Sequence, residues 1–176
     1  MYRCAMKRIA LLFLLAAGVA TFAKPATVTT VILVRHAEKA APSGDVKLSV
    51  HGTLRAEELA RVLADARISA IFTTELIRTG ATAAPLAAAL NITPTVIHTG
   101  PTYAANVVAN ILANQAGKTV LVVGHTDTTV AVLNALHVTP PPTAIPETQF
   151  DNLFICTLVS GQAPVLTTLR YGAAAR

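Results

Sequence analysis

The stretch that decides the fold is TVTTVILVRHAEK, from Thr27 to Lys39. Its first eight residues are apolar or β-branched and uncharged, which is typical of a strand buried on both faces of a sheet. The apolar run ends abruptly in Arg35, His36 and, two residues on, Glu38. A buried arginine is costly to desolvate unless it meets an anion. We therefore expect a central strand whose carboxyl end opens onto a polar site.

Beyond this strand, apolar strand patterns alternate with helical patterns. Such alternation predicts an α/β fold, a three-layer α/β/α arrangement with a mostly parallel central sheet and a C-terminal hairpin. The connection after the third expected strand is too short for an insertion, so no lid domain is expected. We predict further strands at 68–73, 93–98, 118–124, 152–159 and 164–171, and helices within 48–66 and at 74–90, 103–116 and 127–136.

The first 23 residues, MYRCAMKRIALLFLLAAGVATFA, have the layout of a secretory signal peptide. A basic start precedes an apolar run from Ile9 to Ala20, and small residues lead to Ala23. This run is shorter than the ~20 residues of a membrane-spanning helix, so cleavage is expected rather than stable membrane insertion. The predicted organisation is a signal peptide over 1–23 and a single domain over 24–176 that is periplasmic or secreted.

Much of the net positive charge of the chain lies in this leader. The whole chain has 14 basic and 9 acidic residues, a net charge of +5, but Arg3, Lys7 and Arg8 leave with the leader, so the mature charge is 14 − 3 − 9 = +2. No basic run follows, which argues against a nucleic-acid partner. Cys156 is then the single cysteine, and its apolar setting indicates a buried core residue.

Polar side chains follow three of the expected strands. The carboxyl ends of parallel strands share one edge of the sheet, so these side chains should converge there. Guanidinium groups and helix N-termini both suit a phosphate, and the sequence therefore predicts a phosphate site. The residues are Arg35 and His36 after the first strand, Arg78 after the second, and His125 with Thr126 after the fourth.

At these residues the sequence resembles the histidine phosphatase superfamily, which has the phosphoglycerate mutase-like fold. Several motifs in the family's order carry the resemblance, which covers most of the chain after the leader. Among the family, the chain resembles small exported bacterial members. The family's Arg-His-Gly resembles VRHAEK (34–39, with Ala37 for the glycine), its LTxxGxxQA resembles LSVHGTLRA (48–56), its SxLxRTxxTA resembles TELIRTGATA (74–83), its late Gly-His resembles VVGHT (122–126), and its EYDNLF-type strand is similar to FDNLFICTL (150–158).

The resemblance implies a role for each of these residues. His36 would attack phosphorus and form a phosphohistidine that water then hydrolyses. Attack requires a neutral imidazole, so its other nitrogen should donate to a backbone carbonyl. Arg35, Arg78 and His125 would bind the phosphoryl oxygens and stabilise the transition state, with Thr126 contributing at the start of its helix.

The motifs do not identify the general acid. Asp127 is the carboxylate nearest to His125, although an acidic residue in the first turn of a helix is also common for structural reasons. Glu38 is the second candidate, either as the acid or as a pocket residue paired with Lys39 or Arg78. Larger relatives place a glutamate in an insertion near the third strand, and phytase-like relatives place an aspartate directly after the second histidine.

We therefore expect an exported, metal-independent phosphomonoesterase that acts on a small phosphorylated substrate without a cofactor. The sequence has no Cys/His cluster at ligand spacing and no Asp-rich loop that would indicate a metal site. One alternative is a phosphohistidine-protein phosphatase. The other is a non-catalytic protein that binds phosphate or a phosphorylated ligand; an intact His36 favours catalysis over this alternative.

Signal cleavage near Ala23 predicts that the exported protein lacks residues 1–23. Mass spectrometry of the protein from the envelope fraction of a bacterial host should find a first peptide that begins near Lys24. A double variant with Leu12→Arg and Leu14→Arg interrupts the apolar run and should stay unprocessed. Recovery of the Met1 peptide from most molecules of the unaltered chain would contradict cleavage.

Overall fold

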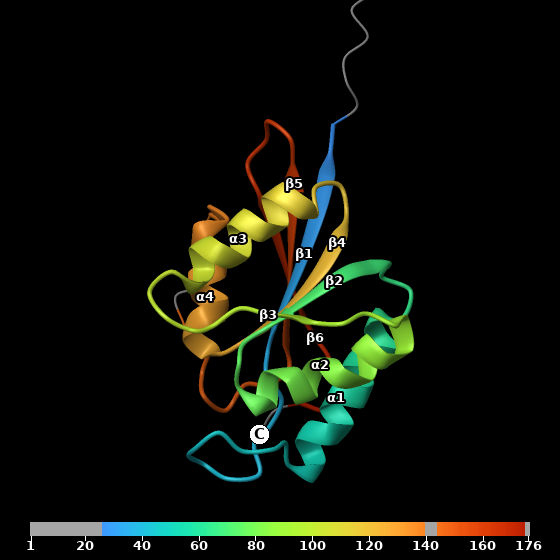
Figure 1. Cartoon of the computed structure of the whole chain (residues 1–176), viewed down its shortest axis with the longest axis vertical. Helices are drawn as coiled ribbons and strands as arrows, with labels where there is room; N and C mark the ends of the chain where they lie inside the picture. Colours follow the sequence, from blue (N-terminus) through green and yellow to red (C-terminus); the bar gives the residue numbers. More distant parts are fainter. Residues whose placement is uncertain (1–25, 140–143, 175–176) are drawn as a thin grey trace, which may run out of the picture.

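The computed structural model describes residues 26–139 and 144–174. Within them the chain forms a six-stranded sheet with four helices (Figure 1). The predicted leader lies outside the described residues, and no described helix is long and apolar enough to cross a membrane. The elements are β1 Val28–Arg35, α1 Val50–Leu63, β2 Ile68–Thr73, α2 Ile77–Leu90, β3 Thr95–Val96, α3 Tyr103–Asn114, β4 Thr119–Gly124, α4 Thr126–Ala135, β5 Asn152–Val159 and β6 Val165–Arg170.

The strands of the sheet are ordered β3-β2-β4-β1-β5-β6. Strands β1 to β4 are mutually parallel, whereas β5 runs antiparallel to β1 and pairs with β6 as an antiparallel hairpin. The hairpin turns at Gly161, whose φ of +78° suits a residue without a Cβ. The predicted α/β class, mostly parallel sheet and terminal hairpin are therefore confirmed.

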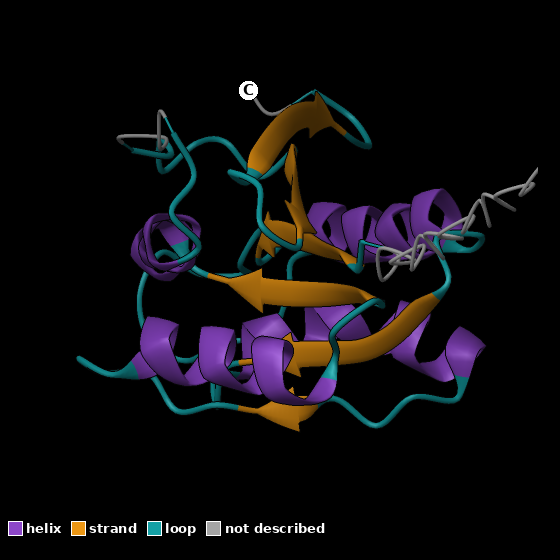
Figure 2. Cartoon of the chain, turned by 90° about the horizontal axis from the view of Figure 1, so that it is seen from above, coloured by secondary structure: helices purple, strands orange, loops and turns teal. Residues whose placement is uncertain are grey.

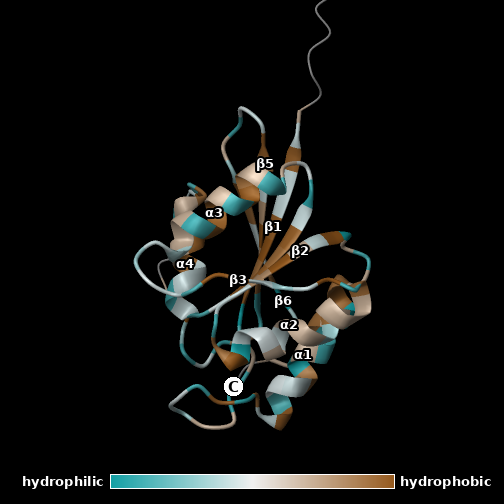
Figure 3. Ribbon diagram, viewed as in Figure 1, coloured by the Kyte–Doolittle hydropathy of each residue, from teal (hydrophilic) through white to brown (hydrophobic). Residues whose placement is uncertain are grey.

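The helices cover both faces of the sheet, as Figure 2 shows. Successive side chains of β1 point to opposite faces, so Val31 and Leu33 pack with α3 and α4, while Ile32 and Val34 pack with α1 and α2. The strands are the most apolar part of the fold (Figure 3). Cys156 is fully buried in this core, and burial raises the pKa of its thiol to about 11.

The helices that follow the neighbouring strands β1 and β4 lie on opposite faces of the sheet. Helix α1 follows β1 onto one face, and α4 follows β4 onto the other. The chain therefore parts at the carboxyl ends of these strands, where Arg35 is paired with Gly124 in the register. This divergence opens a crevice at the edge where open α/β sheets bind ligands.

Two elements differ from their predicted extents. Strand β3 has only two residues, Thr95–Val96, because it pairs only with the end of β2. Helix α2 begins at Ile77 rather than at residue 74, and the Ile77 N–H donates to the Asp45 carboxylate at 2.9 Å. This contact joins segments 32 residues apart, so local helix signals could not reveal it. The described chain from β3 to α3 contains no lid.

Gly52 lets the first turn of α1 approach the backbone that follows β1. Ser49 caps this helix by accepting the Gly52 N–H at 3.0 Å, and the Ser49 N–H donates to the Glu38 carbonyl at 2.9 Å. A Cβ at Gly52 would overlap the Glu38 carbonyl oxygen. The glycine of the LSVHGTLRA segment is therefore required by this close approach of two backbones.

Gly52→Ala should destabilise the protein by about 1–3 kcal/mol, because backbone must shift to make room for the methyl group. Gly80→Ala on α2 is the matched control, since an added Cβ there has nothing within 4 Å. That control should stabilise the helix by about 0.5–1 kcal/mol through helix propensity. Urea denaturation measures both changes, and equal stability of Gly52→Ala and the parent would contradict the steric argument.

Candidate active site

A cavity of about 820 Å³ opens at the carboxyl ends of β1 and β4. All but one of the predicted site residues line it, although they come from distant parts of the sequence. The exception is Glu38, which lines a different cavity. The predicted residues that line the cavity are Arg35, His36, Arg78, His125, Thr126 and Asp127.

His36 is held by backbone contacts in the orientation that a nucleophile needs. The backbone N–H of His36 donates to the Gly124 carbonyl at 2.9 Å, and the ring Nδ1 of His36 lies 2.7 Å from the Ala37 carbonyl oxygen. A carbonyl oxygen only accepts, so Nδ1 carries the ring proton and Nε2 keeps its lone pair. The Ala37 N–H donates to Thr82 Oγ1 at 2.9 Å, which ties this turn to α2.

The His36 imidazole is neutral at ordinary pH. Burial lowers the pKa of His36 to about 3, and the nearby His125, Arg35 and Arg78 oppose protonation further. The Ala37 carbonyl acts in the opposite direction but does not offset burial. A neutral ring with a free Nε2 is the form that can attack an electrophile.

His125 lies against His36 at the start of α4. The two ring centroids are 5.3 Å apart and the rings meet at 61°. The Nε2 atom of His125 is 3.0 Å from Thr74 Oγ1. Burial lowers the pKa of His125 to about 4, and the charge of Arg78 is the next largest cause. The cavity therefore holds two neutral imidazoles, and its positive charge comes from its arginine and lysine side chains.

Several buried polar atoms at this cavity lack a partner in the described structure. They are Arg35 Nε, Arg78 Nε and His125 Nδ1. Arg78 projects from the first turn of α2, and its Nη1 is 3.8 Å from the Asp45 carboxylate. Buried polar groups are normally hydrogen-bonded, so unpaired nitrogens gathered at one cavity are typical of a binding site for an acceptor-rich ligand. An anion such as phosphate fits this set of donors.

Arg35 is already paired, and its partner was not predicted. Its side chain is 3% exposed, and Nη2 donates to Glu147 Oε2 at 2.7 Å. Nη1 donates to the backbone carbonyls of Pro146 at 3.1 Å, Glu147 at 2.7 Å and Gln149 at 3.4 Å. The Phe150 ring lies 4.3 Å from the guanidinium carbon. The anion expected beside Arg35 is thus a side chain of the protein itself.

Glu147 also lines the cavity, and its Oε1 accepts from Thr126 Oγ1 at 3.3 Å. It is 112 residues from Arg35 and follows a proline-rich connection that reads as an exposed loop. One signal could have revealed it. Strand β5 follows this connection and pairs antiparallel with β1, so β5 begins beside the carboxyl end of β1. This pairing brings the residues that precede β5 to the site.

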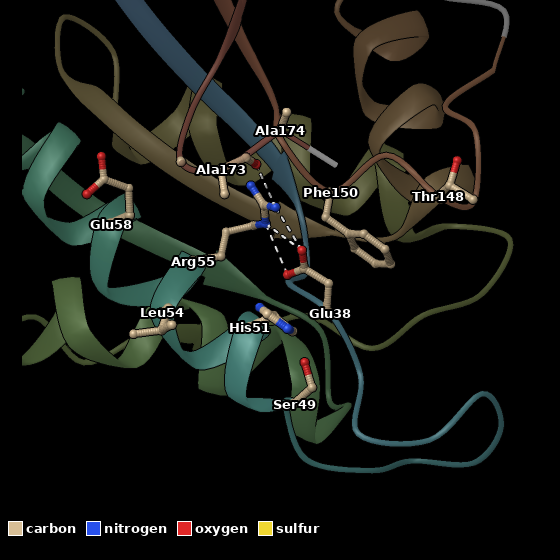
Figure 4. A pocket seen from close by; sticks show the side chains of 11 residues that line it. Glu38, Ser49, His51, Leu54, Arg55, Glu58, Thr148, Phe150, Ala173 and Ala174 are labelled. Atoms are coloured by element: carbon tan, nitrogen blue, oxygen red, sulfur yellow. Dashed lines mark hydrogen bonds and ion pairs between the residues drawn. The ribbon is translucent and has the colours of Figure 1, made fainter. Parts of the chain in front are cut away.

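Glu38 does not pair with Lys39 or Arg78, contrary to the prediction. Both its carboxylate oxygens accept from Arg55 Nε at 3.0 Å, and one accepts from Arg55 Nη2 at 2.7 Å (Figure 4). Buried Arg55 needs this anion, and it also donates to the Tyr171 and Ala173 carbonyls. Glu38 therefore belongs to a structural pair in a neighbouring cavity of about 780 Å³.

Asp127 lines the active cavity and is exposed. One of its carboxylate oxygens accepts from the Thr128 N–H at 2.8 Å, in the first turn of α4. Lys39, which was not predicted as a site residue, also lines the cavity, and its Nζ donates to the Pro42 carbonyl at 2.7 Å. Among the described residues, no group of three or more His, Cys, Asp or Glu side chains could hold a metal ion.

Comparisons with known proteins agree with the fold. The model of the histidine phosphatase superfamily (branch 1) matches residues 31–100, and no curated protein matches the chain. Among solved structures, mycobacterial glucosyl-3-phosphoglycerate phosphatase Rv2419c with inorganic phosphate is similar (TM-score 0.59, 18% identity, 83% of this chain and 98% of that one). SixA from Agrobacterium tumefaciens is also similar (TM-score 0.56, 23% identity, 82% of this chain and 97% of that one). So is phosphoserine phosphatase from Entamoeba histolytica (TM-score 0.58, 16% identity, 83% of this chain and 98% of that one). The chain is thus similar to the histidine phosphatase superfamily over residues 31–100 and to these solved structures in its fold.

Proposed function

We propose that the protein hydrolyses small phosphomonoesters through a phosphohistidine on His36. The observation that carries this proposal is the neutral His36 ring, which donates from Nδ1 to Ala37 and keeps Nε2 as an acceptor at the cavity. The support from the superfamily and from structures of phosphatases with the same fold points the same way.

Catalysis begins with attack of His36 Nε2 on phosphorus. The P–N bond forms as the P–O bond to the leaving alcohol breaks. Arg78 and His125 bind phosphoryl oxygens during this transfer, with Arg35 and Thr126 at the carboxyl ends of β1 and β4. Water then attacks the phosphohistidine, which releases phosphate and restores neutral His36. None of these steps requires a metal ion.

The leaving alkoxide needs a proton, and a cavity carboxylate must supply it. Asp127 remains the acid predicted from the sequence, and its place on the cavity wall is compatible with that role. The second carboxylate on the wall, Glu147, contacts Arg35 at 2.7 Å and Thr126 at 3.3 Å.

A phosphohistidine protein is a second candidate substrate. The described part of the chain forms no lid over the cavity, so a protein side chain could reach His36. The structural similarity to SixA is compatible with this alternative. We also propose that the mature domain acts in the periplasm or outside the cell, on the basis of the leader-like sequence of residues 1–23.

His36→Gln should lower kcat on p-nitrophenyl phosphate by about 100-fold or more, because glutamine cannot form the covalent intermediate. His36 is 3% exposed, so glutamine, which fills more of its space than alanine, is the better replacement. The exposed His51→Gln is the control and should keep activity. Brief reaction with ³²P-labelled substrate should label His36 of the parent, and activity of His36→Gln within a fewfold of the parent would refute the nucleophile.

The free energy of unfolding should fall as the pH is lowered below about 6.5. The folded pKa of His36 is about 3 and the unfolded value is 6.5, so between these values only the unfolded state takes up the proton. His36 alone contributes a slope of up to ~1.4 kcal/mol per pH unit. Urea denaturation at pH 5, 6 and 7 should show a shallower pH dependence in His36→Gln. An unchanged slope would contradict a neutral, buried His36.

A further inference from the structure

The two carboxylates on the cavity wall differ in what holds them. Asp127 is bound by a backbone N–H of its own helix turn. Glu147 is bound by two of the four side chains that were predicted to bind phosphate, Arg35 at 2.7 Å and Thr126 at 3.3 Å. Its side chain is 80% exposed, so these contacts can break without unpacking the core. A phosphate that binds here therefore competes with Glu147 and leaves Asp127 in place.

At Arg35, a substrate can gain a further donor by exchange at Nη2, besides the unpaired Nε. Arg35 Nη1 is occupied by backbone carbonyls, its Nε is buried, and Phe150 lies against the guanidinium. Nη2 is held by the carboxylate of the exposed Glu147 side chain. A phosphoryl oxygen can thus reach Arg35 by taking the place of Glu147 Oε2 at Nη2.

We propose that Glu147 is the catalytic acid and base of this site, and that substrate binding frees it by exchange at Arg35. This inference rests on the proposed phosphatase function. The Glu147 backbone stays anchored through the Arg35 Nη1 contact to its carbonyl, so the released side chain remains beside the bound phosphate. A carboxyl group held beside the bound phosphate can carry the proton that the leaving oxygen needs.

The proton then follows the covalent steps. As His36 Nε2 bonds to phosphorus and the P–O bond breaks, the Glu147 carboxyl gives its proton to the leaving oxygen, which departs as an alcohol. The resulting carboxylate next accepts a proton from the water that attacks phosphorus. The P–N bond breaks, its electron pair returns to Nε2, and phosphate leaves, so Glu147 ends protonated and again pairs with Arg35 after losing that proton to solvent.

Asp127 is less suited to this exchange. It accepts the Thr128 N–H in the first turn of α4, where an acidic side chain stabilises the start of the helix. Among the described hydrogen bonds, none joins Asp127 to a side chain that was predicted to bind phosphate. We therefore assign Asp127 to stabilisation of the helix start and Glu147 to proton transfer.

Kinetics on two substrates separate these roles. Glu147→Gln should lower kcat on glycerol 1-phosphate by about 10²–10⁴, and far less on p-nitrophenyl phosphate, whose leaving group needs no proton. Asp127→Asn should lower both rates by a similar, small factor, and Glu57→Gln on the exposed side of α1 is the control without effect. Glu147→Asp keeps the carboxyl and should retain part of the activity on glycerol 1-phosphate. A large loss that is selective for the alkyl substrate in Asp127→Asn, but not in Glu147→Gln, would overturn the assignment.

Binding of inorganic phosphate tests the exchange without turnover. Calorimetry at pH 6 in two buffers of different ionisation enthalpy counts the protons that accompany binding. On binding phosphate, the parent should gain as much as one proton more than Glu147→Gln. Glu147→Gln should also bind phosphate more tightly, because the competing carboxylate is gone. Equal proton counts and equal affinities would overturn the exchange. If the parent binds phosphate but hydrolyses no phosphomonoester, the proposed function fails, and the calorimetric difference alone decides whether Glu147 and phosphate exchange.

Discussion

The guanidinium of Arg35 is the group on which this site depends. Strand β1 carries it to the centre of the sheet, where it is almost fully removed from water. An unpaired charge in such a place costs several kcal/mol, so the fold has to bring it acceptors. The segment before β5 supplies them as three backbone carbonyls and one carboxylate, which fixes that segment at the carboxyl end of β1.

A second buried arginine acts on the other side of the nucleophile. Arg55 binds Glu38 and two carbonyls of the C-terminal segment, so α1, the turn after β1 and the end of the chain are joined. His36 lies in the sequence between Arg35 and Glu38, each of which is held by a salt bridge to a distant element. The turn that carries His36 is therefore fixed at both ends, so the imidazole proposed as the nucleophile needs little reorganisation to react.

The sequence predicted those features that depend on local patterns. The burial of β1, the α/β order and the convergence of Arg35, His36, Arg78 and His125 follow from apolar periodicity and from the geometry of parallel sheets. The ion pairs could not be predicted in this way, because the partner of each arginine is selected by register and packing. Glu38 paired with Arg55 instead of Lys39 or Arg78 since α1 passes directly over the turn after β1 at Gly52. Glu147 was missed because its place depends on the antiparallel pairing of β5 with β1, and the proline-rich connection itself does not indicate that pairing.

Burial lowers the pKa of His36, His125 and Arg35 alike, but with different results. It removes the proton from His36 and His125, whose pKa values fall to about 3 and 4, whereas Arg35 stays charged because the reference pKa of an arginine is so high. Positive charge is thus kept on groups that bind oxygen and removed from the group that must donate an electron pair. The same desolvation prevents either histidine from storing a proton for the leaving group. The proposed mechanism therefore takes that proton from a carboxyl group at the solvent-exposed rim of the cavity, which can exchange its partners there.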